Sequence, residues 1–191
     1  MEYGLPKSVT LDGSEFAIRY DYRVILEIFE AINDYELTEE ERALAVLQIF
    51  YIDFDELTDY SKALTECFRF INGGRMEQTG GKKQPKLVDW EQDFSYIVAP
   101  VNHILGTDVR GIQYDKDNNT GGLHWWTFLS AYLEITGDCL FAQIVSIREK
   151  KARGKPLDKS DRDFYNRNRD IVDIKTRYTD EENEVLRDWI K

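Results

Sequence analysis

The chain contains two cysteines and two histidines, the side chains whose chemistry is most readily recognised in a sequence. Cys67, Cys139, His103 and His124 do not follow the short, regular spacings of a zinc site, which takes four such ligands. Cys139 and His124 would offer a thiol nucleophile and a base, but no glycine-rich oxyanion turn or acidic orienting residue accompanies them. We therefore expect both cysteines to be buried in a reducing compartment, and His124 to cap a helix or to be a buried, hydrogen-bonded residue.

The loop from Asp115 to Gly121 begins like a calcium-binding EF-hand. An EF-hand requires glycine at its sixth position and a bidentate glutamate at its twelfth. Here those positions hold Thr120 and Trp126, so a turn is expected instead of an ion site. No glycine spacing matches a phosphate-binding or dinucleotide-binding loop. The sequence thus predicts a protein that is not an enzyme and binds no metal or cofactor.

Composition narrows the classes of partner. The chain has 191 residues, 36 acidic and 25 basic, and a formal net charge of −11. Binding to a phosphate backbone requires clustered cations, so nucleic acid is disfavoured as a partner. The basic run from Lys150 to Lys155 could contact nucleic acid or an acidic neighbour, but a solvated connection at a helix C-terminus is the favoured interpretation. No apolar run approaches the roughly 20 residues that cross a bilayer. We expect no membrane association and no signal peptide, and a location in the cytoplasm.

The first 20 residues predict a β-hairpin. Val9–Leu11 and Phe16–Ile18 alternate in polarity around Asp12-Gly13, a pair that favours a type I′ turn. A lone hairpin is marginally stable, so it must pack on helices or pair with another chain. The candidate residues for self-association are Val9, Leu11, Phe16 and Ile18.

Helical periodicity dominates residues 21–150, the predicted core of a mainly α-helical, multi-helix single domain. Helices are expected from Tyr22 to Ile32, from Thr38 onward, at residues 59–72 and at residues 89–105, with others after Leu123 and Cys139. Thr38 and Glu41 match a capping box. The expected core positions of the second and third of these helices are Leu44, Leu47, Phe50, Tyr51, Ala63, Leu64, Cys67, Phe68 and Ile71. Pro100 predicts a kink or break in the fourth helix.

Residues 151–191 predict a C-terminal helical extension, with one helix at residues 158–174 and another that opens at a capping box formed by Thr179 and Glu182. Val185, Leu186, Trp189 and Ile190 give the last helix an apolar stripe. The stripe either closes the core, which is the favoured interpretation, or forms one wall of a binding groove.

Adjacent tryptophans follow His124 at a predicted helix start. Each tryptophan buries up to about 250 Å² and must find a partner for its indole N–H. Because a helix turns by about 100° per residue, Trp125 and Trp126 cannot share one face. We expect one to lie in the core and the other to be at least partly accessible, either for structure or to bind a partner.

Three segments together carry a resemblance to a known family. They are the acidic, aromatic helix start Asp89-Trp90-Glu91-Gln92-Asp93, the segment Leu123-His124-Trp125-Trp126-Thr127-Phe128, and a later helix that ends in Ile144-Val145-Ser146-Ile147-Arg148. In this order they resemble the "gene product fifteen" family of tailed phages that infect Gram-positive bacteria. The stretch 106–119 departs from the family pattern, because a polar insertion follows Leu105-Gly106-Thr107-Asp108-Val109 where a shorter turn is expected.

The resemblance implies a tail assembly chaperone. Such a protein binds the long, helical tape measure protein in the cytoplasm of the bacterial host while tail tube subunits assemble around it, and is absent from the mature virion. The implied partners are the tape measure protein, the major tail protein as a second possible partner, and further copies of the chain in a homo-oligomer. The alternative is a structural virion protein, such as a tail-completion or head–tail connector subunit, which would share this acidic and helical composition.

Overall fold

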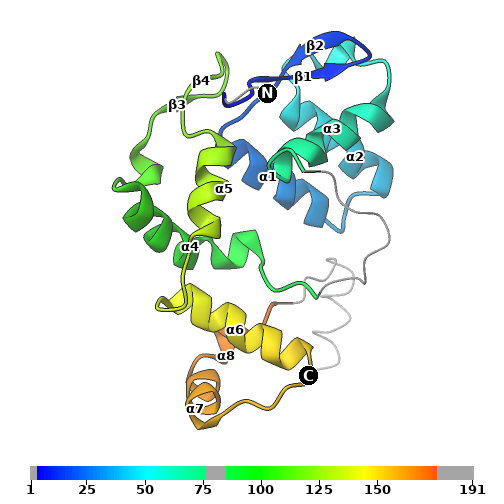
Figure 1. Ribbon diagram of the computed structural model, residues 1–191. Coiled ribbons are helices and arrows are strands. Elements are labelled where there is room, and N and C mark those ends of the chain that lie inside the picture. The colour runs from blue at the N-terminus through cyan, green and yellow to red at the C-terminus, as the bar shows by residue number, and fades with distance from the viewer. Residues whose placement is uncertain (1–3, 76–84, 176–191) are drawn as a thin grey trace.

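The computed structural model describes residues 4–75 and 85–175 of the chain. These residues form eight α-helices, two short 3₁₀ turns and two two-stranded antiparallel hairpins. Figure 1 shows the N-terminal hairpin with α2 and α3 at one end of the molecule and α6, α7 and α8 at the other, with α4 and α5 between them. The prediction of a mainly helical domain with an N-terminal hairpin is therefore confirmed.

The elements follow one another in this order along the chain. The N-terminal half contains β1 (Ser8–Leu11), β2 (Ser14–Ala17), α1 (Tyr22–Asn33), α2 (Glu39–Phe50), η1 (Phe54–Glu56) and α3 (Tyr60–Ile71). The second half contains α4 (Trp90–Leu105), η2 (Val109–Gly111), β3 (Tyr114–Asp115), β4 (Thr120–Gly121), α5 (Trp125–Leu133), α6 (Leu140–Ala152), α7 (Lys159–Arg167) and α8 (Arg169–Val172).

The N-terminal hairpin has the turn that its sequence predicts. Asp12 and Gly13 both have positive φ, of 50° and 87°, as a type I′ turn requires. β1 and β2 pair with Leu11 opposite Ser14. Lys62 on α3 donates to the Asp12 carboxylate at 2.8 Å and so ties the turn to the helices.

Side-chain caps fix where several helices begin. Thr38 and Glu41 form the predicted capping box at the start of α2, in which each side chain accepts the other residue's backbone N–H. Aspartates cap α1, α3, α4 and α7 at Asp21, Asp59, Asp89 and Asp158. These caps satisfy N–H groups that lack a partner inside the helix.

The larger hydrophobic cluster is rich in aromatic rings and joins the hairpin to α1–α5. Its largest fully buried side chains include Trp125, Tyr22, Tyr51, Phe50 and Phe128. Tyr22 stacks on Phe128 with the ring centroids 4.8 Å apart, an offset arrangement that adds to the gain from burial.

Two residues predicted for this core are exposed instead. Leu44 and Phe68 are 38% and 39% accessible. The buried stripe of α2 runs through Val46, Leu47 and Phe50, and Leu44 lies to one side of it. Phe68 lies outside the buried stripe of α3 in the same way. Predicted apolar faces were thus wider than the faces that the packing covers.

The helices at Pro100 and at Asn168 also differ from expectation. α4 runs unbroken through Pro100, although the missing N–H was expected to kink or interrupt it. Pro100 is partly exposed and lines a groove beside α4. The single helix expected at residues 158–174 is divided at Asn168 into α7 and α8.

A smaller hydrophobic cluster holds the C-terminal extension against α6. Ile144, Ile147 and Val172 are fully buried in it. The predicted boundary after residue 150 falls inside the last turn of α6. Two lysines of the basic run form ion pairs between α6 and the C-terminal extension. Lys150 pairs with Asp161 and Lys151 with Asp173, at 2.5 Å each. The acidic neighbours of this run are therefore within the chain itself.

A buried ion pair joins α4, α6 and α8. The Arg148 guanidinium donates to both carboxylate oxygens of Asp93, at 2.6 and 2.9 Å, and also to the carbonyls of Leu87, Ile171 and Val172. The side chains of Arg148 and Asp93 are 5% and 0% accessible. Asp93 also accepts the N–H of Asp89. The many hydrogen bonds offset the cost of removing both charges from water.

Replacing Arg148 with leucine is expected to destabilise the protein by about 3–5 kcal/mol, because it leaves the Asp93 carboxylate buried without its cation. The measurement is urea unfolding followed by circular dichroism. Arg153→Leu is the matched control, since Arg153 forms an exposed pair with Glu149 that should contribute about 0–1 kcal/mol. Equal losses in the two variants would contradict the role assigned to the buried pair.

Candidate functional site

The sequence-predicted contact residues fall into three groups. Ile18 is fully buried within the chain, so it offers no surface for self-association. Val9, Leu11 and Phe16 are partly buried against the core, and their part in self-association stays a prediction. The stripe of Val185, Leu186, Trp189 and Ile190, with the capping box of Thr179 and Glu182, lies outside the described residues.

The segment Leu123–Trp126 is held to the start of α1 by backbone hydrogen bonds. The N–H of Tyr22 donates to the Leu123 carbonyl at 3.0 Å, and the N–H of Trp125 donates to the Tyr20 carbonyl at 2.7 Å. The buried Asp21 carboxylate accepts the N–H of Leu123 at 2.7 Å. A side chain at Gly122 would collide with that carboxylate, which explains glycine there. We call the hydrogen bonds that Leu123–Trp126 form with the start of α1, with Pro6 and with the end of α3 the clasp.

His124 is the N-cap of α5, as predicted. Its Nδ1 accepts the N–H of Trp126 at 3.0 Å, so the proton of the neutral ring lies on Nε2, which donates to the Pro6 carbonyl at 2.8 Å. Burial lowers the pKa of His124 and so favours this neutral form. Both ring nitrogens of His124 are thus used in hydrogen bonds that support the fold.

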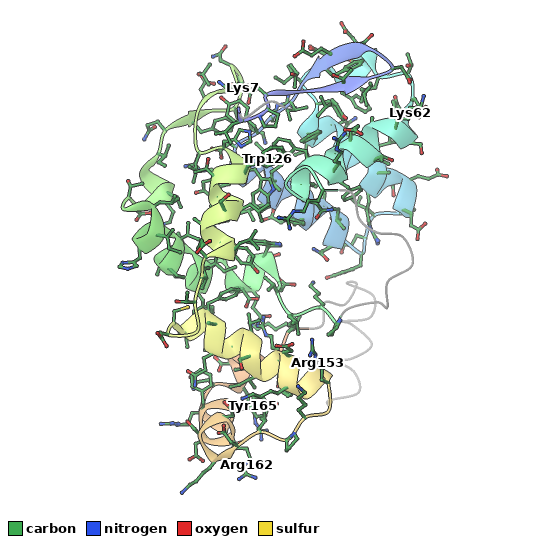
Figure 2. The ribbon with its side chains drawn as sticks, viewed as in Figure 1. Lys7, Lys62, Trp126, Arg153, Arg162 and Tyr165 are labelled. Carbon is green, nitrogen blue, oxygen red and sulfur yellow. The ribbon has the colours of Figure 1, made fainter. Side chains whose placement is uncertain are left out.

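The two tryptophans close the C-terminal end of α3. The indole of Trp125 donates to the Ile71 carbonyl and that of Trp126 to the Phe70 carbonyl, both at 2.8 Å. Carbonyls in the last turn of a helix have no intrahelical partner. The Trp125 indole supplies one to Ile71, and the Trp126 indole adds a second donor to the Phe70 carbonyl, which also accepts the N–H of Gly73 at 3.0 Å. Trp125 is 1% accessible, whereas Trp126 is partly accessible and lies between α5 and α3 (Figure 2). The expectation of one core and one partly accessible tryptophan is confirmed.

The residues that were considered as candidates for catalysis or metal binding have structural roles. The Cys139 sulfur accepts the N–H of Ala142 as the N-cap of α6, and Cys139 is only partly buried, contrary to expectation. Cys67 is buried, which raises the pKa of its thiol. The Asp115 carboxylate accepts N–H groups of Asp117 and Asn118 within the β3–β4 turn. Among residues 4–75 and 85–175, no three metal-ligand side chains form a cluster.

The apolar surface best shaped to receive another chain lies along α4. A groove of about 590 Å³ runs between α4 and the α5–α6 connection. Successive turns of α4 form one wall, and the connection forms the other. Its lining includes Tyr96, Ala99, Pro100, Ile104, Ile135 and Leu140. We call it the α4 groove.

Large apolar side chains are exposed in and near the α4 groove. Ile104 and Leu140, which line it, are 41% and 43% accessible, and Leu133, the last residue of α5 and the neighbour in sequence of the lining residue Glu134, is 65% accessible. No other large apolar side chain that the structure describes is as exposed as Leu133. Exposed apolar side chains grouped around a groove indicate a contact surface.

The charged groups that line the α4 groove are acidic. Glu134 and Asp138 lie on the connection, and the α4 wall adds His103 but neither lysine nor arginine. The groove therefore offers an apolar floor and an acidic edge.

Sequence reasoning did not find this groove. Ile104 and Leu140 belong to different helices, and the polar stretch Glu134-Ile135-Thr136-Gly137-Asp138 between α5 and α6 reads as a simple connection. No local pattern joins these residues, because the groove forms only where α4 lies beside this connection.

Lowering the pH from 7 to 5 is expected to destabilise the protein partly through His124. Burial lowers its pKa in the folded state from the ordinary value of 6.5, so the unfolded state binds the proton first. The stability that the neutral ring contributes is present above pH 6.5 and is lost as the pH falls towards the folded-state pKa. His124→Asn keeps a capping side chain and should show a smaller loss of melting temperature over this range. An unchanged pH dependence would contradict this role.

Comparison with protein families identifies the family of the chain. A family model described as "Bacteriophage Gp15 protein" matches residues 1–174. Comparisons with curated proteins and with solved structures found no match. Within residues 4–75 and 85–175, none of the helices combines the length and apolar character needed to cross a membrane. The match spans most of the chain, from the hairpin through the clasp to α8, and the chain therefore belongs to the bacteriophage Gp15 protein family.

Proposed function

We propose that this protein is a phage tail assembly chaperone that binds the tape measure protein without catalysing a reaction. Membership of the bacteriophage Gp15 family over residues 1–174 carries the proposal, because it supports a role in the structure or morphogenesis of a phage. A chaperone needs a surface for its client, and the α4 groove supplies a candidate.

The shape of the α4 groove suits a helical client. An amphipathic helix binds through side chains at positions i, i+3, i+4 and i+7, which enter an apolar groove. The groove has room for several such side chains, and the exposed lining residues Ile104 and Leu140 would cover their flanks. Burial of these exposed side chains would stabilise the complex by about 25 cal/mol for each Å² of apolar area removed from water.

The charge of the groove favours a client with basic residues beside its apolar stripe. Glu134 and Asp138 would pair with lysine or arginine on the bound helix. The overall charge of −11 attracts a basic client and keeps the chaperone soluble. This charge also limits contact between groove surfaces of different copies. We place the protein in the host cytoplasm during assembly and not in the finished virion.

Co-expression with a fragment of the tape measure protein of the same phage tests the function. Wild-type protein should keep in solution a fragment that otherwise precipitates, and Ile104→Lys should lose most of this effect. The introduced lysine lies near the C-terminus of α4, where its positive charge interacts favourably with the helix dipole. The melting temperature should therefore change little. Phe68→Lys is the matched control, since Phe68 is 39% accessible near the C-terminus of α3.

The outcomes separate the possibilities. Loss of solubilisation in Ile104→Lys but not in Phe68→Lys would support the groove. Equal behaviour of the two variants would exclude the groove as the client site. Failure of the wild-type protein would count against the chaperone role, and recovery of the chain from purified phage particles by mass spectrometry would favour the alternative, a structural virion protein.

A further inference from the structure

One edge of the N-terminal hairpin is open. The N–H of Ile18 donates to the Lys7 carbonyl at 3.0 Å, which makes Lys7–Ile18 a hydrogen-bonded pair. Such pairs alternate along an antiparallel ladder, so the backbone groups of Ser8 and Thr10 point away from β2. Within the part of the chain that the structure describes, no hydrogen bond reaches these groups.

The other edge of the hairpin is already used. The Ala17 carbonyl accepts the N–H of Ile52 at 3.1 Å, and Ile18 forms a bridge with Tyr51. Beside the open edge of β1 lies a cleft of about 220 Å³, bordered by Ser8 and Thr10 on one side and by Glu66 and Phe70 of α3 on the other. The hairpin stands at one end of the molecule (Figure 1), where another chain can reach it.

We propose that two copies of this chain pair antiparallel through β1, with Val9 opposite Val9 across a two-fold axis. The two hairpins then form one four-stranded sheet. Ser8 of each copy lies opposite Thr10 of the other, and the four outward N–H groups meet four carbonyls. Open edges that carry no charged side chain invite pairing of this kind, and Ser8–Leu11 contains none.

Local chemistry selects this register. A shift that placed Pro6 opposite Thr10 would lose a hydrogen bond, because proline has no N–H. A shift in the other direction would place Ser8 opposite Asp12, whose φ of 50° belongs to the turn and cannot continue a strand. The register centred on Val9 alone uses both outward-facing residues of each copy.

The side chains also agree with this register. Val9 and Leu11 lie on the face that packs against the core, so the apolar row continues across the axis. Ser8 and Thr10 meet on the opposite face, where a hydroxyl pair is favourable. Lys7 approaches the acidic turn residue Asp12 of the second copy, and no two like charges stand directly opposite.

Analytical ultracentrifugation of the full chain tests the dimer. The wild-type protein should dimerise as its concentration rises, and Thr10→Pro should raise the dissociation constant about 30-fold, since symmetry removes two hydrogen bonds of about 1 kcal/mol each. Glu15→Pro is the matched control, because Glu15 lies opposite Thr10 in the hairpin but its N–H points from the other edge. Melting temperatures show whether either proline disturbs the fold.

Cysteine cross-linking tests the register without proline. In a Cys139→Ser background, which keeps the α6 cap, Val9→Cys should form a disulfide-linked dimer under oxidation. A pair without direct hydrogen bonds places the two Cα atoms about 4.5 Å apart, within the range that a disulfide spans. Thr10→Cys should not cross-link, because the two copies of residue 10 are offset along the strands.

Dimerisation that Thr10→Pro weakens and Glu15→Pro does not, together with a cross-link at residue 9 only, would support the β1 interface. A chain that stays monomeric at every concentration would overturn it. A dimer that Thr10→Pro leaves intact, or one in which Val9→Cys does not cross-link, would overturn it as well. If Thr10→Pro unfolds the protein, the two cysteine variants decide the question.

Discussion

Three segments that are distant in the sequence meet the loop after β4 at the start of α5, and hydrogen bonds to backbone groups hold them together. The start of α1, the chain entering β1 and the end of α3 each contact Leu123–Trp126. Every polar group in this clasp is buried or partly buried, so loss of one partner would leave another unsatisfied away from water, which is costly. The most distinctive residues of the chain therefore determine its architecture, and the surfaces that we propose for partners lie elsewhere.

The path of α5 connects the clasp to the α4 groove. α5 begins at Trp125 within the clasp and ends at Leu133, immediately before the groove-lining residue Glu134, so fixing its first turn also positions that side of the groove. At the far end of the molecule, the buried pair of Asp93 and Arg148 fixes α4 against α6, which sets the other wall. We assign two surfaces to partners, the groove and the open edge of β1. Buried polar contacts elsewhere in the protein position the elements that carry these surfaces.

Local signals in the sequence predicted local structure well. The Asp12-Gly13 turn, the capping box of Thr38 and Glu41, and the role of His124 depend on residues within a few positions of one another, and the structure confirms each. Non-local features were missed. Arg148 reads as the end of an amphipathic helix, and only folding brings it to Asp93. The exposure of Leu44 and Phe68 was missed for the same reason, since periodicity shows which residues are apolar but not how much of that face a neighbour covers. The α4 groove depends on the juxtaposition of α4 with a connection 30 residues later, which no local pattern encodes.

We propose that the clasp holds the fold while the α4 groove receives the client. Hydrogen–deuterium exchange of the protein, alone and with a tape measure fragment, tests this most directly. In the free protein the amides of Tyr22, Leu123 and Trp125 should be among the slowest to exchange, because each is a hydrogen-bond donor within the clasp. Addition of the fragment should then protect residues 95–104 and 134–140 and leave residues 122–126 unchanged. New protection at residues 122–126, with none along the groove, would contradict the account.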